Sequence, residues 1–278
     1  ELKDLIVARE NDELSHIIAH SYPFLRDREK IAESIEKIMD YAEDSLPVLN
    51  AQNQLIGILT SQDIMEVACA EMGADYAKLA GLMTEEDLGE TTAVSMRKRL
   101  PWLMVLLLLG MGVSTVVGSF EGVVAVLPVV ICFQSLILDM AGNVGTQSLA
   151  VTIRVLMDEH LNAKDKLALV GKEIKVGFGN GLLLGLMAFF FLGAYINLFK
   201  GYTPGAAWLI SGCVGVSLLL AMTISSMVGT LVPLLFHRIH VDPAVASGPL
   251  ITTVNDLVAV VTYYGLAWLL LIQHFHVK

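Results

Sequence analysis

The stretch DPAVASGPLITTVND, residues Asp242–Asp256, opens the last long apolar segment of the chain and places a carboxylate inside it. Gly248, Thr252 and Asp256 recur every four residues, so on a helix they form one stripe along a single face. A carboxylate at membrane depth is costly unless it faces water, a cation or a partner. The stripe therefore predicts a functional site within a membrane-spanning helix.

The chemistry of this stretch favours a hard divalent cation such as Mg²⁺, which prefers oxygen ligands and keeps much of its water. Because Pro249 has no N–H, we expect the backbone carbonyl one turn earlier to lack its helical hydrogen-bond partner. Asn255 and, at the cytoplasmic end, Asp242 complete the candidate metal site with the stripe. The alternative is a Pro-kinked helix whose Asp256 is buried against a polar neighbour.

The composition indicates a membrane protein with a soluble portion. The chain has 278 residues, 55% of them hydrophobic, and a mean hydropathy of +0.64. Residues 1–100 hold 20 Asp and Glu against 10 Lys and Arg, whereas residues 101–278 hold 8 of each. This acidic soluble portion argues for cations as partners and against nucleic acid. The three cysteines have neither disulfide nor zinc spacing, and the start at Glu1 predicts that an N-terminal part precedes the chain.

Residues 12–67 alternate helical and strand patterns, which predicts a small α/β domain. IAESIEKIMDYA has helical spacing, whereas SLPVLN and QLIGILT are short apolar strands joined by a polar turn. Residues 62–80 continue as a long helix, for which Thr60, Ser61 or Asp63 is the candidate cap. The run LPVLNAQNQLIGILTSQDIMEV resembles the second half of a CBS domain, and residues 1–11 resemble the tail of a preceding repeat.

The segment GILTSQD, Gly57–Asp63, is similar to the pattern with which some CBS domains hold an adenine nucleotide. The resemblance implies a candidate ATP site in which the Thr60 hydroxyl meets phosphate and the Asp63 carboxylate meets the ribose. Residues 62–100 are then a connecting helix and a polar linker, and SMRKRLPWL enters the membrane.

Five apolar runs are long enough to cross about 30 Å of hydrocarbon, at roughly 102–120, 122–146, 176–199, 205–236 and 245–272. The predicted fold class is mixed: a small α/β module (βαββα) and a connecting helix precede an α-helical membrane domain over residues 101–278. With the soluble part in the cytoplasm, 9 Lys and Arg lie inside and only Lys200 and Lys278 outside. The positive-inside rule predicts that orientation, with an extracytoplasmic C-terminus.

Small and polar residues are expected to end the second span, in DMAGNVGTQS. Gly142 and Gly145 allow close helix approach. The polar side chains either line the ion path or hydrogen-bond across helices, two interpretations that the sequence leaves open. The side chains concerned are Asp139, Asn143 and Gln147.

Three signatures in chain order are similar to the MgtE family of bacterial magnesium channels and transporters. They are the CBS module with its exit helix, AGNVGTQS followed by Arg154, and DPAVASGPLITTVNDLVAVVTYY, with KRLPWL at the first span. The resemblance covers nearly the whole chain. It implies a homodimer in the inner (plasma) membrane, with five spans per subunit and a pore lined by the second and fifth spans. In that pore Asp256 holds hydrated Mg²⁺, and Gly248 and Thr252 bracket the ion.

The resemblance also implies that acidic residues of the CBS module and exit helix sense cytoplasmic Mg²⁺. This sequence departs from the dense acidic run of the family, because its exit helix reads EVACAEMGADYAKLAG. Only Glu66, Glu71 and Asp75 remain as candidate regulatory ligands. We expect transport to persist and gating to be weak, retuned or taken over by a nucleotide.

The leading interpretation is a divalent-cation channel or transporter with Mg²⁺ as its main ion, and not an enzyme. Alternatives are a secondary transporter of Co²⁺ or Mn²⁺, a transport-dead regulatory protein, and an intramembrane aspartyl protease with Asp139 and Asp256 as its dyad. Such proteases typically contain a Tyr-Asp pair and a Gly-x-Gly-Asp motif. This chain has neither motif, because Leu138 precedes Asp139, and Val254 and Asn255 precede Asp256. The protease is therefore the weakest of these alternatives.

Overall fold

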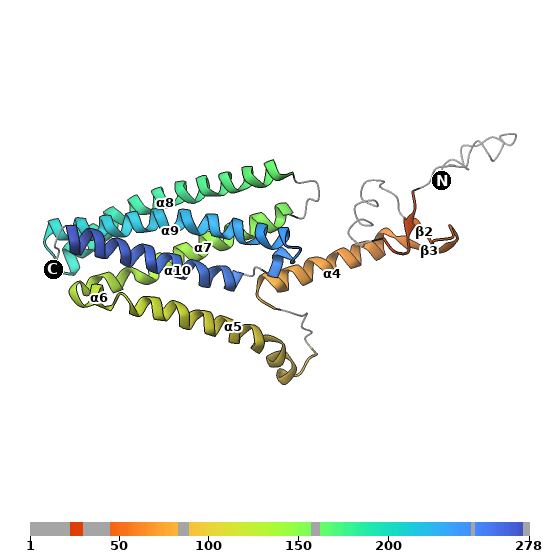
Figure 1. Cartoon of the computed structure of the whole chain (residues 1–278), viewed down its shortest axis with the longest axis horizontal. Coiled ribbons are helices and arrows are strands. Elements are labelled where there is room, and N and C mark those ends of the chain that lie inside the picture. Colours follow the sequence, from red (N-terminus) through yellow and green to blue (C-terminus); the bar gives the residue numbers. More distant parts are fainter. Residues whose placement is uncertain (1–22, 30–44, 83–88, 157–161, 246–247, 275–278) are drawn as a thin grey trace. The chain divides into compact units, whose positions relative to one another are not determined.

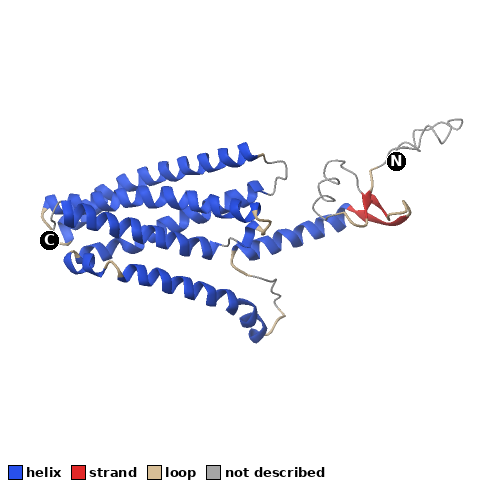
Figure 2. Cartoon of the chain, viewed as in Figure 1, coloured by secondary structure: helices blue, strands red, loops and turns tan. Residues whose placement is uncertain are grey.

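The computed structural model describes residues 23–29, 45–82, 89–156, 162–245 and 248–274. Helices make up most of this part of the chain, and its strands form one small sheet (Figure 2). The chain divides into two compact units, residues 1–73 and residues 74–278, and each is described by itself (Figure 1). The predicted fold class, a helical membrane domain after a small α/β module, is confirmed.

The first unit contains a three-stranded sheet in the order β1 (Leu25–Arg26), β2 (Ser45–Leu49) and β3 (Leu55–Thr60). β1 pairs parallel to β2, and β2 pairs antiparallel to β3. Asn53 in the turn between β2 and β3 has a φ of 58°, a left-handed conformation that asparagine tolerates. Both predicted strands of this hairpin are confirmed.

A small apolar cluster holds the sheet together. Leu25 and Leu46 are buried, and Val48 and Leu59 pack against them. The predicted helix at residues 31–42 and the repeat tail at residues 1–11 lie outside the described residues.

The helix α4 (Ser61–Leu79) follows β3 directly, and a reciprocal cap fixes its start. Asp63 Oδ2 accepts hydrogen bonds from the backbone N–H of Thr60 at 2.9 Å and from its hydroxyl at 2.6 Å. Thr60 Oγ1 accepts from the N–H of Asp63 at 3.2 Å. Because the first N–H groups of a helix lack intrahelical partners, this exchange fixes where α4 begins. The long exit helix is therefore confirmed, with Thr60 as its cap.

The second unit holds five helical segments that are long and apolar enough to cross a membrane. They are α5 (Thr92–Gly118), α7 (Ile131–Leu156) with its preceding turn, α8 (Ala163–Phe199), α9 (Pro204–Arg238), and α10 (Gly248–Leu266) with the continuing η3 (Ala267–His274). α9 packs against α7, α8 and α10 and forms the centre of the unit. α5 packs mainly against α10, and none of its 27 residues is buried.

The second crossing segment differs from its prediction at both ends. A short helix, α6 (Glu121–Val126), is followed by the 3-10 turn η1 (Pro128–Val130) and then by α7. Pro128 lacks an N–H and disfavours helical geometry at the residue before it, and Leu127 has φ −134° and ψ 76°. The crossing segment is therefore 128–156 rather than 122–146, and the polar stretch 139–148 lies inside it rather than at its end.

α8 begins at Ala163 rather than near residue 176. A capping box fixes this start, in which Asp165 Oδ2 accepts from the N–H of Asn162 at 3.2 Å. The segment that contains Glu173 is therefore part of the crossing helix and not of the preceding loop. This difference decides the position of a buried carboxyl group described below.

α10 changes its winding at Ala267. Residues 248–266 are α-helical, whereas η3 is a π-helix, whose hydrogen bonds join residues five apart. Ala267 and Leu271 are buried, and Trp268 and Leu269 are exposed. Ala267 and Leu271 thus continue the buried face of α10 into η3.

Candidate cation-binding site

The stripe predicted on α10 begins at the first residue of the helix. The Thr252 hydroxyl donates to the Gly248 carbonyl with 2.9 Å between the oxygens. Asp256 follows one turn later on the same face. Pro249 is the second helical residue, where an N–H has no intrahelical partner in any case. Because α10 starts at Gly248, the carbonyl one turn before Pro249 belongs to the segment that precedes the helix.

Asp256 is half-buried near the middle of α10. Among the residues that the structure describes, its carboxylate has neither a hydrogen-bond partner nor an ion pair. A carboxylate without a partner is costly within hydrocarbon, so this position favours water or a cation beside it.

Contacts between α7 and α10 set the depth of Asp256. The Tyr263 hydroxyl donates to the Val130 carbonyl at 2.8 Å, Thr252 lies against Gly142, and Thr146 lies near Gly248. These pairs show that the two helices run antiparallel. At this register Asp139 of α7 lies at the level of Asp256 of α10.

α7 presents polar side chains on a face that the rest of the single chain leaves uncovered. Asp139, Asn143 and Gln147 are all exposed and follow one another at four-residue spacing. The Asn143 amide donates to Asp139 Oδ1 at 3.1 Å. The structure thus places these three side chains together on one stripe, at the depth of the α10 site.

Asn255 lies on another face of α10 from Asp256. It is fully buried against Gly145, and a Cβ at that glycine would overlap the Asn255 amide. Neither polar atom of the amide has a hydrogen-bond partner among the described residues. Asn255 was predicted as a metal ligand, but within one chain it faces α7 and not the stripe.

Asp242 precedes α10 and is paired with a lysine. Its Oδ2 lies 2.6 Å from Lys78 Nζ near the end of α4, and its Oδ1 accepts from the N–H of Ala244 at 2.9 Å. Partial burial favours the neutral acid, but the hydrogen bonds from Lys78 and Ala244 outweigh it and lower the pKa of Asp242. A cation at Asp242 would therefore compete with Lys78.

The candidate regulatory and nucleotide residues lie on or beside α4. Thr60 and Asp63 bond each other in the helix cap, and the hydrogen bonds from the Thr60 hydroxyl and N–H lower the pKa of Asp63. Glu66 is exposed. Glu71 and Asp75 are residues of α4, and their side chains lie outside what the structure describes.

The sequence interpretation missed one buried carboxyl group, Glu173 of α8, whose exposed fraction is 5%. Its side chain lies beside Ser148 of α7, and its backbone carbonyl lies beside Ser226 of α9. The predicted span began near residue 176 and so did not include Glu173. The capping pattern at Asn162 and Asp165 was the signal that could have extended the helix.

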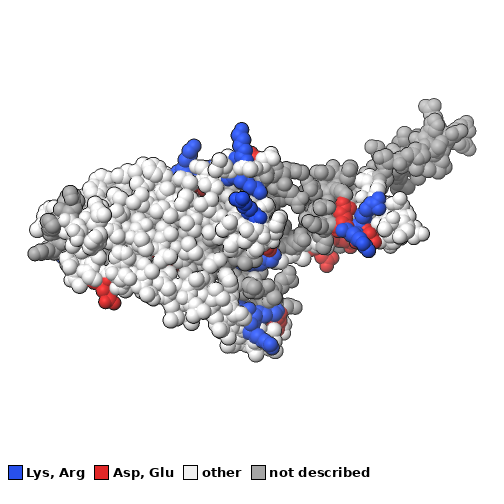
Figure 3. Space-filling model, viewed as in Figure 1, with Lys and Arg blue, Asp and Glu red and all other residues white. Residues whose placement is uncertain are grey.

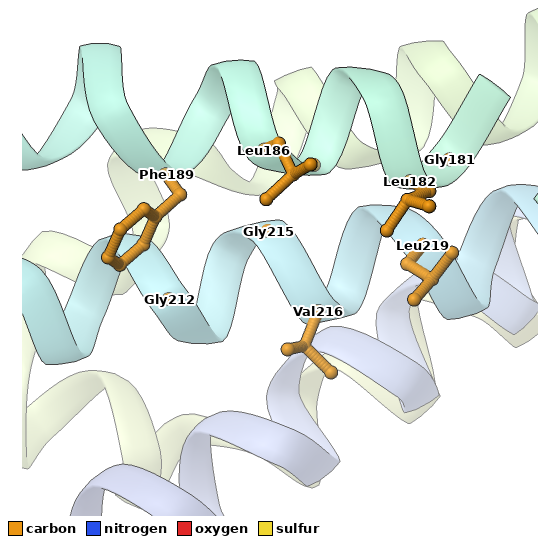
Figure 4. A pocket seen from close by; sticks show the side chains of 9 residues that line it. Gly181, Leu182, Leu186, Phe189, Gly212, Gly215, Val216 and Leu219 are labelled. Atoms are coloured by element: carbon orange, nitrogen blue, oxygen red, sulfur yellow. The ribbon is translucent and has the colours of Figure 1, made fainter. Parts of the chain in front are cut away.

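Two further surfaces bear on where a cation passes. A groove between α8 and α9 is lined by glycine and apolar side chains alone, among them Leu182, Leu186 and Phe189, so it offers a cation no ligand (Figure 4). On the face drawn in Figure 3, Lys and Arg gather at the end of the helices where α5 and α8 begin, and most of the remaining helical surface is uncharged. This charge asymmetry is typical of a multi-pass membrane protein.

The model of the MgtE family, described as a divalent cation transporter, matches residues 134–266. The membrane part of this chain is thus similar to the MgtE family. The match includes both Asp139 and Asp256. The model of the CBS domain matches residues 14–69, ahead of the MgtE part.

Relatives of the MgtE family resemble nearly the whole chain. The magnesium transporter MgtE of Enterococcus faecalis is 34% identical over 270 residues, which are 96% of this chain and 56% of the relative. Those of Bacillus subtilis and Thermus thermophilus are 32% and 34% identical, over 95% and 97% of this chain and 57% and 58% of their own lengths. The chain thus spans a little over half the length of these relatives. Their names as transporters agree with the prediction of a non-enzyme.

Proposed function

We propose that this chain forms the membrane domain of a divalent-cation transporter that carries Mg²⁺. The observation that carries the proposal is the half-buried Asp256 carboxylate, which has no partner among the described residues of a crossing helix. Mg²⁺ gives up its water reluctantly, so a carboxylate that binds the hydrated ion suits it better than a dedicated cage. The Gly248 carbonyl and the Thr252 hydroxyl supply further oxygens along the same face.

The pore is proposed to lie between two copies of the chain. Asp139, Asn143 and Gln147 would face hydrocarbon if the chain were alone, which is costly for a charged stripe. A second copy related by a two-fold axis places the same stripe opposite, with water between the two. Mg²⁺ then passes between paired carboxylates of α7 and α10.

We place the CBS module in the cytoplasm of a cell with this protein in its inner (plasma) membrane. The charged ends of α5, α7, α8 and α9 support this orientation through the positive-inside rule. Five crossings then leave the C-terminus on the outer side.

Regulation is proposed to reach the pore through the last turn of α4. Lys78 is paired with Asp242, and the Leu79 carbonyl would lie 3.3 Å from a Cβ at Gly248. These contacts join the end of the connecting helix to the first residue of the stripe. Mg²⁺ at Glu66, Glu71 and Asp75, or ATP at Thr60 and Asp63, would act on the pore along this connection.

Ion flux into proteoliposomes tests the proposal. Asp256→Asn keeps the size of the side chain and removes its charge, so Mg²⁺ flux should fall at least tenfold. Glu121→Gln, an equivalent change at an exposed carboxylate of α6, is the matched control and should leave flux unchanged. Equal flux through wild type and Asp256→Asn would refute the site. Competition by Co²⁺ and Mn²⁺ in the same assay ranks the ions.

A further inference from the structure

Three helices meet at a cluster of oxygen atoms that the proposed ion path does not use. Ser148 Oγ of α7 lies 2.9 Å from Glu173 Oε2 of α8 and 2.8 Å from Ser226 Oγ of α9. Ser226 Oγ in turn lies 2.7 Å from the Glu173 backbone carbonyl oxygen. All three residues are buried, with exposed fractions of 2%, 5% and 0% for Ser148, Glu173 and Ser226.

Counting hydrogens decides the chemical form of this cluster. Contacts of this length between oxygens are hydrogen bonds, and each needs one hydrogen between its two atoms. Three such contacts are present, but Ser148 and Ser226 supply one hydroxyl hydrogen each, and a carbonyl or an ionised carboxylate supplies none. One hydrogen is missing.

Neighbouring hydroxyl groups do not provide it. Thr152 donates to the Ser148 carbonyl at 2.7 Å, and Thr230 donates to the Ser226 carbonyl at 3.0 Å. Each of these hydrogens is thus directed at the backbone of its own helix. The remaining source within the cluster is the carboxyl group of Glu173.

We propose that Glu173 holds a proton and that this proton closes a hydrogen-bonded ring through α7, α8 and α9. The Glu173 carboxyl group donates to Ser148 Oγ, Ser148 donates to Ser226 Oγ, and Ser226 donates to the Glu173 carbonyl. Every contact then has one hydrogen. The ligand of this site is a proton, bound inside a crossing segment away from Asp256.

The surrounding charges agree with a neutral acid. Among the described residues Glu173 has no ion-pair partner. On its own helix, Lys172 and Lys175 are exposed. The neighbouring helices α7 and α9 carry their own charged or titratable side chains at Arg154, His237 and Arg238. All three side chains are exposed, and each lies more than one helical turn from Ser148 or Ser226 in sequence. An ionised Glu173 would therefore be a buried charge without a counter-ion, which is strongly disfavoured.

The ring also gives the proton a structural role. Without it, one of the three oxygen pairs would face each other with no hydrogen between them. Since each bond joins two different helices, loss of the proton would loosen α8 against α7 and α9.

Infrared spectroscopy of the protein in liposomes at neutral pH tests the proposal directly. The carbonyl stretch of a neutral carboxylic acid is separate from that of a carboxylate, and ¹³C-labelled glutamate shifts the signal of Glu away from that of Asp. We expect one protonated glutamate per chain in the wild type, with a shift to lower frequency in D₂O. Absence of this band would overturn the proposal without any variant being needed.

Variants assign the band to the ring. Glu173→Gln should remove the band, because the amide supplies the same donor without an acid. Ser148→Ala should shift its frequency, since the acid loses its acceptor. Ser217→Ala, which removes a buried hydroxyl of α9 that bonds its own helix at Cys213, is the matched control and should change nothing. A band that persists in Glu173→Gln would place the proton elsewhere and refute the site. None of these readouts depends on Mg²⁺ transport.

Discussion

Gly145 of α7 lies directly against the side-chain amide of Asn255 of α10. A Cβ at Gly145 would overlap the amide nitrogen and would also lie 3.3 Å from a methyl carbon of Ile251. The same glycine contacts Gly229 of α9 through its carbonyl. Three helices thus meet around one residue that has no side chain.

Substitution at this meeting point is expected to destabilise the membrane domain. Gly145→Ala should lower the free energy of unfolding by about 1–3 kcal/mol, the usual cost of overpacking a filled core. Thermal unfolding in detergent measures this loss. Gly179→Ala is the control, because a Cβ there meets nothing within 4 Å. If both variants unfold at the same temperature, the close approach of α7 and α10 is incorrect.

Asp139 of α7 and Asp256 of α10, which lie at the same depth, are expected to contribute unequally to Mg²⁺ flux. Asp139 already accepts a hydrogen bond from Asn143, whereas Asp256 has no partner among the described residues. Asp139→Asn should therefore reduce Mg²⁺ flux less than Asp256→Asn does. Flux into proteoliposomes at several Mg²⁺ concentrations measures both. The reverse order would move the principal ion contact from α10 to α7.

The ion pair of Lys78 and Asp242 is expected to contribute little to stability and to fail in acid. Both side chains are more than a third exposed, so removing either should cost about 0.5 kcal/mol, less at high salt. The folded-state pKa of Asp242 is lowered, so its contribution is present above the unfolded pKa of about 4 and is lost as pH falls through the folded value.

A double-mutant cycle with Lys78→Ala and Asp242→Ala isolates this contribution. Because Lys78 has further interactions, only the coupling between the two substitutions reports on the pair. Thermal unfolding at pH 7 and at pH 3 gives the coupling at each pH. A coupling as large at pH 3 as at pH 7 would contradict the assignment.

Asp63→Ala is expected to destabilise the start of α4, because it removes the acceptor of both Thr60 bonds. The hydrogen bonds from Thr60 lower the pKa of Asp63, so the stabilisation is present at neutral pH and disappears in acid. Helical circular dichroism at pH 7 should fall in the variant.

The predicted contact between the Asp63 carboxylate and the ribose of ATP is tested by calorimetric titration with ATP. Unchanged ATP affinity in Asp63→Ala would exclude the ribose contact. Mg²⁺ flux measured without ATP should be unaffected in either case.

The number of crossing helices could be predicted because long apolar runs decide it by composition alone. The stripe of Gly248, Thr252 and Asp256 could also be predicted, because its spacing lies within one helix. The break at Pro128 was missed since the apolar run continues across it. Burial of Glu173 depends on Ser148 and Ser226, which lie 25 and 53 residues away in sequence. No local pattern reports such partners, and the predicted span began only after Lys172 and Lys175.

The π-helical winding after Leu266 affects how α10 is to be mapped by chemical labelling. If single cysteines are placed along residues 248–274 and their reaction with a water-soluble reagent is measured, reactivity should repeat with the α-helical period up to Leu266. From Ala267 onward the period lengthens, so reactive positions shift around the helix. Buried Ala267 and Leu271 and exposed Trp268 and Leu269 are the first positions to compare across this change of winding.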